Sequence, residues 1–151
     1  MDIKIMRATE TWQQAGAYYV RIQAMAKQYG ITLREEFDEH DTPDTRYIVL
    51  LDRDFPVATC RLYELPEDEA ELPTMMLGRI VVLPEYRKHG LGRLAVTEAE
   101  KWAMELGCRK AVLDSRDVAV GFYEKLGYTA YPDKTVKGWT FTCIHMEKML
   151  K

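Results

Sequence analysis

The stretch YRKHGLGRLAV, residues 86–96, places two glycines and a run of basic side chains just before an apolar segment with helical spacing. A helix N-terminus offers unpaired N–H donors and about half a positive charge, and glycines let an anion approach the backbone closely. The basic groups concentrate positive charge in a chain whose formal net charge is -3. The pattern therefore predicts an anion site formed by Arg87, Lys88, His89, Gly90, Leu91, Gly92 and Arg93.

Two nucleotide-binding motifs are similar to this turn, and neither fits it well. The segment from Gly90 to Ala95 matches G-x-G-x-x-A, and Asp114 ends a strand about twenty residues later, as a dinucleotide fingerprint requires. However, seven residues separate Val82 from Gly90, whereas the fingerprint places its first glycine directly after the strand. An ATP-binding P-loop needs Gly-Lys-Ser/Thr, which the turn lacks. A helix start without any ligand stays open as the simplest alternative.

The elements that must position this turn predict mixed α/β structure in a single domain over residues 1–151. Apolar residues at spacings of three and four predict a helix over 91–106, closed by Gly107. Thr11, with Gln14 three residues later, predicts the capped start of another helix that runs to about Tyr29. Strands are predicted at 3–6, 46–52, 56–65, 75–83, 110–114, 128–131 and 138–146, and a short helix at 118–126.

The turn and a second motif together resemble a known enzyme family. VVLPEYRKHGLGRLAV, residues 81–96, is followed by SRDVAVGFYEKLGY, residues 115–128. This pair resembles the GNAT superfamily of acyl-CoA-dependent N-acyltransferases, in which a strand leads to R/Q-x-x-G-x-G/A at a helix start and a later short helix carries a YEKLGF-like sequence. The resemblance is close over residues 77–131. RYIVLL near the middle and TCIHMEKML at the end are also similar to small bacterial acetyltransferases.

The resemblance implies an α/β (mixed α+β) fold, with a mixed, mostly antiparallel sheet, two splayed parallel strands and flanking helices. It implies acetyl-CoA as the acyl donor, with the coenzyme A pyrophosphate on residues 87–93 and the pantetheine arm between the splayed strands. Backbone groups of the strand would pair with that arm, and we expect the Val82 N–H to donate to the thioester carbonyl. Arg116 stands where the family often has an asparagine that contacts pantetheine, so its role as a cofactor-binding residue is open. The strand residues expected to contact the cofactor are Ile80, Val81 and Val82.

Tyr123 matches the family's tyrosine that hydrogen-bonds the leaving sulfur. Reference pKa values of about 10 for tyrosine and about 8.5 for a thiol make full proton transfer to the thiolate uphill. Tyr123 could therefore act either by stabilising the charge of the thiolate through a hydrogen bond or as a general acid, and both roles stay open. Aromatic packing on the core is the structural alternative.

The attacking amine must be neutral, so a base is needed on the acceptor side. Glu35, Glu36 and Asp38, in the acidic loop after the first predicted helix, are candidates to attract the amine or take its proton, with Glu36 preferred among them. His145 is a further candidate for the base. A solvated loop and a core histidine are the structural alternatives. The nearby Asp38, His40 and Asp41 lack a fourth ligand, so no metal is predicted.

Composition narrows the remaining function classes. With a formal net charge of -3, the chain lacks the basic excess that nucleic-acid or anionic-membrane binding requires. Its three cysteines show no metal-ligand or paired spacing, and no apolar run is long enough for a signal peptide or a membrane span. We therefore expect a soluble cytoplasmic protein.

The leading hypothesis is an N-acetyltransferase that transfers an acetyl group from acetyl-CoA to a primary amine by direct attack in a ternary complex. The acceptor would be a small-molecule or peptide amine, and the acidic loop favours a cationic one. A homodimer is compatible with the resemblance, although no segment identifies an interface. The alternative is a non-catalytic module of the same fold that binds or senses acyl-CoA. Thiol release with a panel of amines distinguishes the two.

Overall fold

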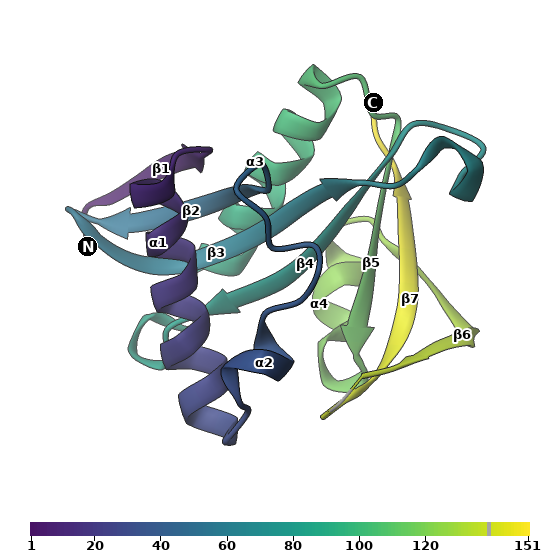
Figure 1. The fold of residues 1–151 in the computed structure, drawn as a ribbon. Helices are drawn as coiled ribbons and strands as arrows, with labels where there is room; N and C mark the ends of the chain where they lie inside the picture. The colour runs from purple at the N-terminus through teal and green to yellow at the C-terminus, as the bar shows by residue number, and fades with distance from the viewer. Residues whose placement is uncertain (139) are drawn as a thin grey trace.

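The computed structural model describes residues 1–138 and 140–151. Its strands form one seven-stranded sheet in the order β1-β2-β3-β4-β5-β7-β6 (Figure 1). The strands are β1 (Ile3–Ala8), β2 (Arg46–Asp52), β3 (Phe55–Glu64), β4 (Thr74–Val82), β5 (Lys110–Arg116), β6 (Thr129–Lys137) and β7 (Thr142–Met149). The helices are α1 (Thr11–Arg21), α2 (Leu33–Glu36), α3 (Leu91–Glu105) and α4 (Val120–Lys125), with a π-helical segment at Ile22–Lys27 and 3-10 turns at Glu67–Glu69, Pro84–Tyr86 and Asp117–Ala119.

The sheet is antiparallel except where β4 meets β5. These two strands run parallel and pair through Thr74–Met76 of β4 and Lys110–Val112 of β5. Over the rest of the described strands no pairing joins them, so β4 and β5 separate toward their C-terminal ends (Figure 1). The predicted mixed fold with a splayed parallel pair is confirmed.

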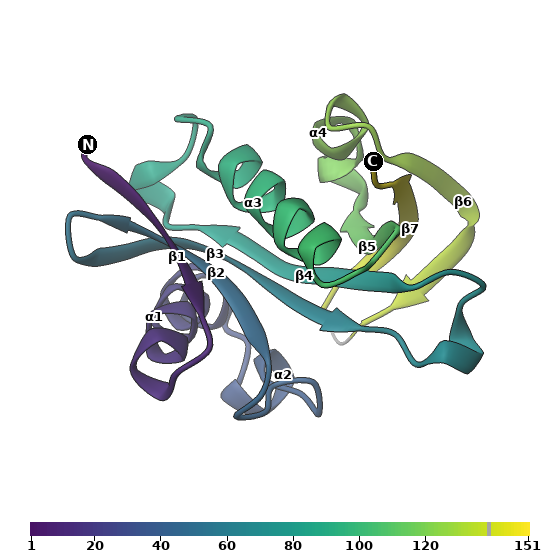
Figure 2. The same cartoon turned by 90° about the horizontal axis from the view of Figure 1, so that it is seen from above.

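Helices cover both faces of the sheet. In Figure 2, α1 and α2 lie on one face and α3 and α4 on the other. Along α3 the inward stripe contains Ala95, Ala99 and Ala103, which are fully buried. These small side chains let the helix lie close to the sheet, and Trp102 fills the space at its C-terminal end. The predicted apolar stripe is therefore confirmed. Because the glycine turn forms the N-terminus of α3, the packing of this stripe also sets the position of the turn.

An irregularity in β4 lies where that strand begins to leave β5. Arg79 and Ile80 together stand opposite Cys60 of β3, because the register shifts between the Gly78–Arg61 and Val81–Thr59 pairs. Arg79 has a φ of 47°, a left-handed conformation that is uncommon for a residue with a side chain. Such a bulge bends the strand and redirects the bulged side chain. No local pattern in the sequence indicates this bulge.

Some local details differ from the predictions. The side-chain oxygen of Gln13, not Gln14, accepts from the N–H groups of Thr9 and Glu10, so the capping pair lies one residue earlier. Gln14 is buried and donates to the Thr45 carbonyl at 2.9 Å, which ties the loop before β2 to the helix. The first helix also widens into the π-helical segment. Position 139, in the predicted strand 138–146, lies outside the described residues.

No described helix is both long and apolar enough to cross a membrane.

Candidate functional site

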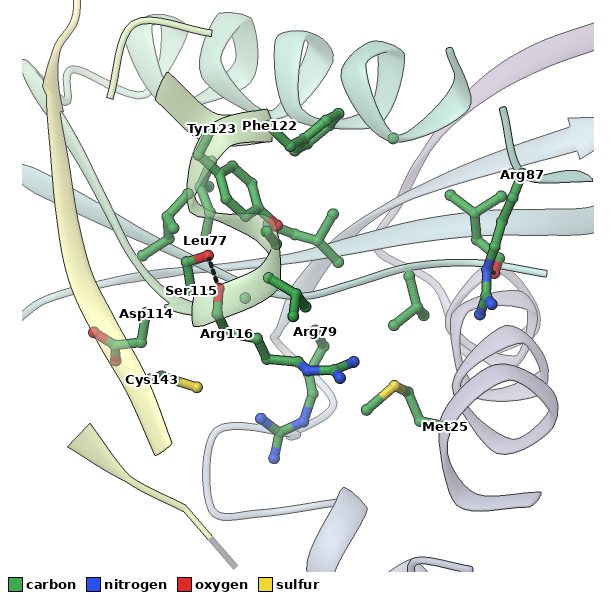
Figure 3. Close-up of a pocket in the computed structure, with 18 of the residues that line it drawn as sticks. Met25, Leu77, Arg79, Arg87, Asp114, Ser115, Arg116, Phe122, Tyr123 and Cys143 are labelled. Atoms are coloured by element: carbon green, nitrogen blue, oxygen red, sulfur yellow. Dashed lines mark hydrogen bonds between the residues drawn. The ribbon is translucent and has the colours of Figure 1, made fainter. Parts of the chain in front are cut away.

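A cavity of about 680 Å³ occupies the gap between β4 and β5 (Figure 3). Its walls come from both faces of the sheet: Met25 and Tyr29 belong to the α1 side, whereas Phe122 and Tyr123 belong to α4. The gap therefore joins the two faces, and two reactants could enter from opposite sides. The predicted site residues that line the cavity are Ile80, Val81, Val82, Arg87, Lys88, Gly90, Leu91, Gly92, Arg116 and Tyr123. His89 and Arg93 are exposed and are not among the lining residues.

The glycine turn opens α3 at one end of this cavity. Gly90 is the N-cap residue with a φ of 76°, a conformation that glycine adopts at little cost. A Cβ on Gly90 would meet nothing within 4 Å, so open space lies beside it. At Gly92 a Cβ would come within 3.3 Å of the Phe122 ring. The first N–H groups of α3 have no partner within the helix, and Arg87 and Lys88 stand beside them, so the turn suits an anion.

The backbone of β4 presents polar groups to the gap. The Leu83 N–H donates to the Val57 carbonyl on β3 at 2.9 Å. Because successive residues of a strand direct their N–H and C=O groups to opposite sides, those of Val82 point away from β3 and toward β5. The Val82 carbonyl accepts from Arg87 Nε at 3.2 Å. The Val82 N–H is therefore directed toward a ligand in the gap.

Tyr123 is buried, yet its hydroxyl opens onto the cavity. The side chain is 7% exposed, and its ring packs edge-on against Phe122 and Tyr128. Figure 3 shows the ring directed into the cavity. No hydrogen bond joins the hydroxyl to another residue in the described part of the chain. Burial raises the pKa of Tyr123, so the hydroxyl keeps its proton at neutral pH and can donate it in a hydrogen bond.

The structure places Glu36 in a buried ion-pair network, which does not fit the base considered from the sequence. Glu36 is 3% exposed, and its Oε2 accepts from Arg21 Nε at 2.9 Å. Arg79 Nε lies 3.4 Å from the same oxygen and donates to the Glu36 carbonyl at 2.9 Å. Two guanidinium groups thus hold the carboxylate, and Glu36 is not among the residues lining the cavity. We assign Glu36 to positioning the loop and Arg79.

Asp38 and Asp41 of the acidic loop are also held by arginine side chains. Asp41 accepts from Arg21 Nη1 at 2.7 Å, from Arg61 Nη1 at 3.1 Å and from the Tyr47 hydroxyl at 2.6 Å. Arg61 also binds Asp38 at 2.8 Å. Burial alone would raise the pKa of Asp41, but the hydrogen bonds and charge of Arg21, aided by Tyr47, hold it well below its usual range. Glu36, Asp38 and Asp41 therefore offer little free negative charge to a cationic acceptor, whereas Glu39 on the same loop is exposed beside His40.

His145 lies beside the site and not in it. Its Nδ1 is 3.0 Å from Asp114 Oδ1, and its Nε2 is 2.8 Å from Glu147 Oε2. Asp114 lines the cavity and His145 does not. Sequence reasoning missed Asp114 for this site, although the pairing of β5 with β7 sets it opposite His145. The histidine thus contacts the cavity through Asp114.

Arg116 crosses the mouth of the cavity on the α1 side. Its Nη1 donates to the Tyr29 hydroxyl at 3.3 Å, and its guanidinium carbon lies 3.9 Å from the Phe141 ring centroid. Arg116 lines the cavity, and its contact with pantetheine stays a prediction. Within residues 1–138 and 140–151, no group of histidine, cysteine and acidic side chains has the arrangement of a metal site.

Comparisons with known proteins agree with this geometry. Residues 7–128 match the Acetyltransferase (GNAT) family. The chain is 35% identical over 114 residues to a putative acetyltransferase of Bacillus subtilis (strain 168), with 74% of each chain covered. It is also similar to the crystal structure of a putative N-acetyltransferase from Lactobacillus plantarum, with 30% identity, a TM-score of 0.87 and 100% of both chains covered.

A more distant structure shares the fold. The aminoglycoside 6'-N-acetyltransferase complexed with coenzyme A has 19% identity and a TM-score of 0.73, with 100% of this chain and 98% of that chain covered. Because the family match spans most of the chain and relatives at 30% identity or more cover the same region, this protein belongs to the GNAT acetyltransferase family.

Proposed function

We propose that the protein transfers an acetyl group from acetyl-CoA to a primary amine by direct attack within a ternary complex. The observation that carries the proposal is the Tyr123 hydroxyl, buried in the gap between β4 and β5 and unengaged by described residues. Membership of the GNAT family supports it. The coenzyme A in the related aminoglycoside 6'-N-acetyltransferase supports the choice of acyl donor. We assign the activity to a single domain over residues 1–151 that acts in the cytoplasm.

The glycine turn fits the pyrophosphate of coenzyme A. Its open space at Gly90 and the free N–H groups of the first turn of α3 would accept phosphate oxygens. Arg87 and Lys88 line the same end of the cavity and would add charge. From there the gap between the splayed strands continues past Val82, where the pantetheine arm would lie along β4.

Two groups would stabilise the charge that develops during transfer. The amine nitrogen attacks the thioester carbonyl carbon, and negative charge forms on the carbonyl oxygen. The Val82 N–H is the donor that we assign to that oxygen, a contact worth about 3 kcal/mol in comparable sites. As the C–S bond breaks, the Tyr123 hydroxyl donates to the leaving thiolate. Since burial raises the pKa of Tyr123, the phenol keeps its proton and solvent protonates the thiolate.

Asp114 is the acidic side chain among the described residues that line the cavity, and we assign it to the amine. Its carboxylate would orient the incoming ammonium group and receive the proton that the nitrogen loses. His145 would act as a positioning residue, because its ring holds Asp114 on one side and Glu147 on the other. This arrangement replaces Glu36 and His145 as the bases expected from the sequence.

The decisive experiment is a thiol-release screen of amines with acetyl-CoA, followed by mass spectrometry of the products. Stoichiometric coenzyme A and N-acetylated amine are expected. If coenzyme A binds tightly while no amine on a broad panel is acetylated, the protein is a binding or sensing module and the proposal fails. Sedimentation of the purified protein separately tests the homodimer, which stays a prediction.

A further inference from the structure

The end of the cavity on the α1 face carries a guanidinium group that no carboxylate compensates. Within residues 1–138 and 140–151, no ion pair joins Arg116 to an acidic side chain, and its hydrogen-bond partner is the neutral Tyr29 hydroxyl at 3.3 Å. The Phe141 ring, 3.9 Å from the guanidinium carbon, holds the group in place. A guanidinium that is fixed in position and lines a cavity is well suited to bind a carboxylate or phosphate bidentately.

The charges around Arg116 do not cancel it. Arg79, which lines the same cavity, is already held by Glu36 and Asp38. Asp114 is engaged by His145. Burial raises the pKa of the neighbouring Cys143 thiol, and Asp114 and Asp117 add to the rise, whereas Arg116 and Arg79 oppose it. Of the two guanidinium groups in that region, Arg79 is paired with acidic side chains, and Arg116 is the one that no described ion pair engages.

Arg116 extends toward the α1 and α2 face of the sheet. The glycine turn opens α3, which covers the opposite face of the sheet from α1 and α2 (Figure 2). Arg116 instead reaches Tyr29, and Arg79 reaches Glu36, both on the α1 and α2 face. Figure 3 shows both side chains extending into the cavity. Arg87 of the glycine turn also reaches this side, where its Nη2 donates to Gln28 Oε1 at 3.1 Å. A loss of acetyl-CoA affinity alone in an Arg116 variant would therefore place its guanidinium on the donor and not on the acceptor.

We infer that the acceptor is a small-molecule amine that also carries an acidic group, and that Arg116 binds this carboxylate or phosphate while Asp114 receives the amine. The inference rests on the proposed acetyl transfer and narrows its acceptor. A cavity of about 680 Å³ has to hold both the end of the pantetheine arm and the acceptor, which favours a compact molecule. The inferred acceptor replaces the cationic acceptor that the acidic loop favoured, because arginines already hold Glu36, Asp38 and Asp41 of that loop.

The test compares matched amines that differ by the acidic group alone. One pair is an α-amino acid and its decarboxylated amine; the other is an amino sugar phosphate and the unphosphorylated amino sugar. The wild-type kcat/KM is expected to be higher for the acidic member of at least one pair by about 10-fold or more. Loss of a hydrogen bond between charged groups costs at least this factor. The pair that shows the preference identifies carboxylate or phosphate as the anion.

Arg116→Gln should then lower the ratio of kcat/KM within that pair by about 10- to 100-fold. Arg116→Lys keeps the charge without the planar fork and should restore part of the ratio. Arg109→Gln, the same change at an exposed arginine just before β5, is the control and should leave the ratio unchanged. A pair ratio unaffected by Arg116→Gln, or a rise in KM for acetyl-CoA as its only effect, would overturn the inference.

A binding measurement distinguishes failure of the proposed acetyl transfer from failure of the anion site at Arg116. If no amine is acetylated, calorimetry measures binding of the same pairs to the protein saturated with coenzyme A. Binding of the acidic member that is lost in Arg116→Gln and kept in Arg109→Gln supports the anion site while the transferase proposal fails. Equal binding of both members, or none of either, overturns the inference itself.

Discussion

Removal of the Tyr123 hydroxyl separates catalysis from packing. The phenylalanine in Tyr123→Phe keeps the ring that packs against Phe122 and Tyr128, and the lost hydroxyl has no hydrogen-bond partner among the described residues. The free energy of unfolding should therefore change by less than about 0.5 kcal/mol. A hydrogen bond to the leaving thiolate, by contrast, is worth about 1.5–3 kcal/mol. We expect kcat to fall by about 10- to 150-fold, with the affinity for acetyl-CoA nearly intact.

Tyr128→Phe is the matched control. Its hydroxyl donates to Glu100 Oε2 at 2.7 Å, so its removal leaves a buried carboxylate with Lys148 as the remaining partner. The control should lose about 1–3 kcal/mol of stability and keep its kcat. Turnover is followed by thiol release, with single-turnover mixing to confirm that chemistry is rate-limiting, and stability by urea unfolding. An unchanged kcat in Tyr123→Phe, or equal losses of stability in both variants, would refute the assignment.

Three further predictions concern the donor, the acceptor and the acidic loop. Gly92→Glu should abolish coenzyme A binding in calorimetry, because the new side chain places bulk and negative charge in the proposed phosphate site. Retained affinity would contradict pyrophosphate binding at the glycine turn. Asp114→Asn should lower kcat/KM for the amine by about 100-fold or more and leave KM for acetyl-CoA unchanged. If the variant keeps the pH–rate profile of the wild type, Asp114 is not the proton acceptor. The lowered pKa of Asp41 contributes stability that is present above about pH 4 and is lost as the pH falls through its folded value. Asp41→Asn should cost about 3–5 kcal/mol at pH 7 and flatten this acid dependence; an equally steep acid loss in urea titrations would contradict the ion-pair account.

The features predicted correctly depend on neighbouring residues. Each of these features lies within one short segment, where residue spacing and local chain geometry determine the structure. They are the glycine turn, the apolar stripe of α3 and the short helix that carries Tyr123. The splayed parallel pair followed from the resemblance. The capping pair was placed one residue late, because Thr11 with Gln14 and Glu10 with Gln13 both have capping side chains and tertiary contacts chose between them.

The errors in the site depend on long-range contacts. Glu36 was expected to be free, yet its partners Arg21 and Arg79 come from α1 and β4. The direction of Arg79 follows from a bulge in β4, which no local signal announces. The role of Arg116 was left open from the sequence; it lines the cavity and contacts Tyr29 and Phe141, which come from distant segments. The positions of these side chains depend on contacts between segments that are distant in the sequence, and the pattern of a single sequence does not reveal those contacts.

Direct transfer is the central claim, and intact-protein mass spectrometry with product analysis tests it most directly. Protein incubated with acetyl-CoA alone and then freed of it should carry no acetyl group, and added amine should not be acetylated. With acetyl-CoA and amine present together, one N-acetylated amine should form for each coenzyme A released. An acetylated protein that passes its acetyl group to the amine after acetyl-CoA is removed would contradict the account.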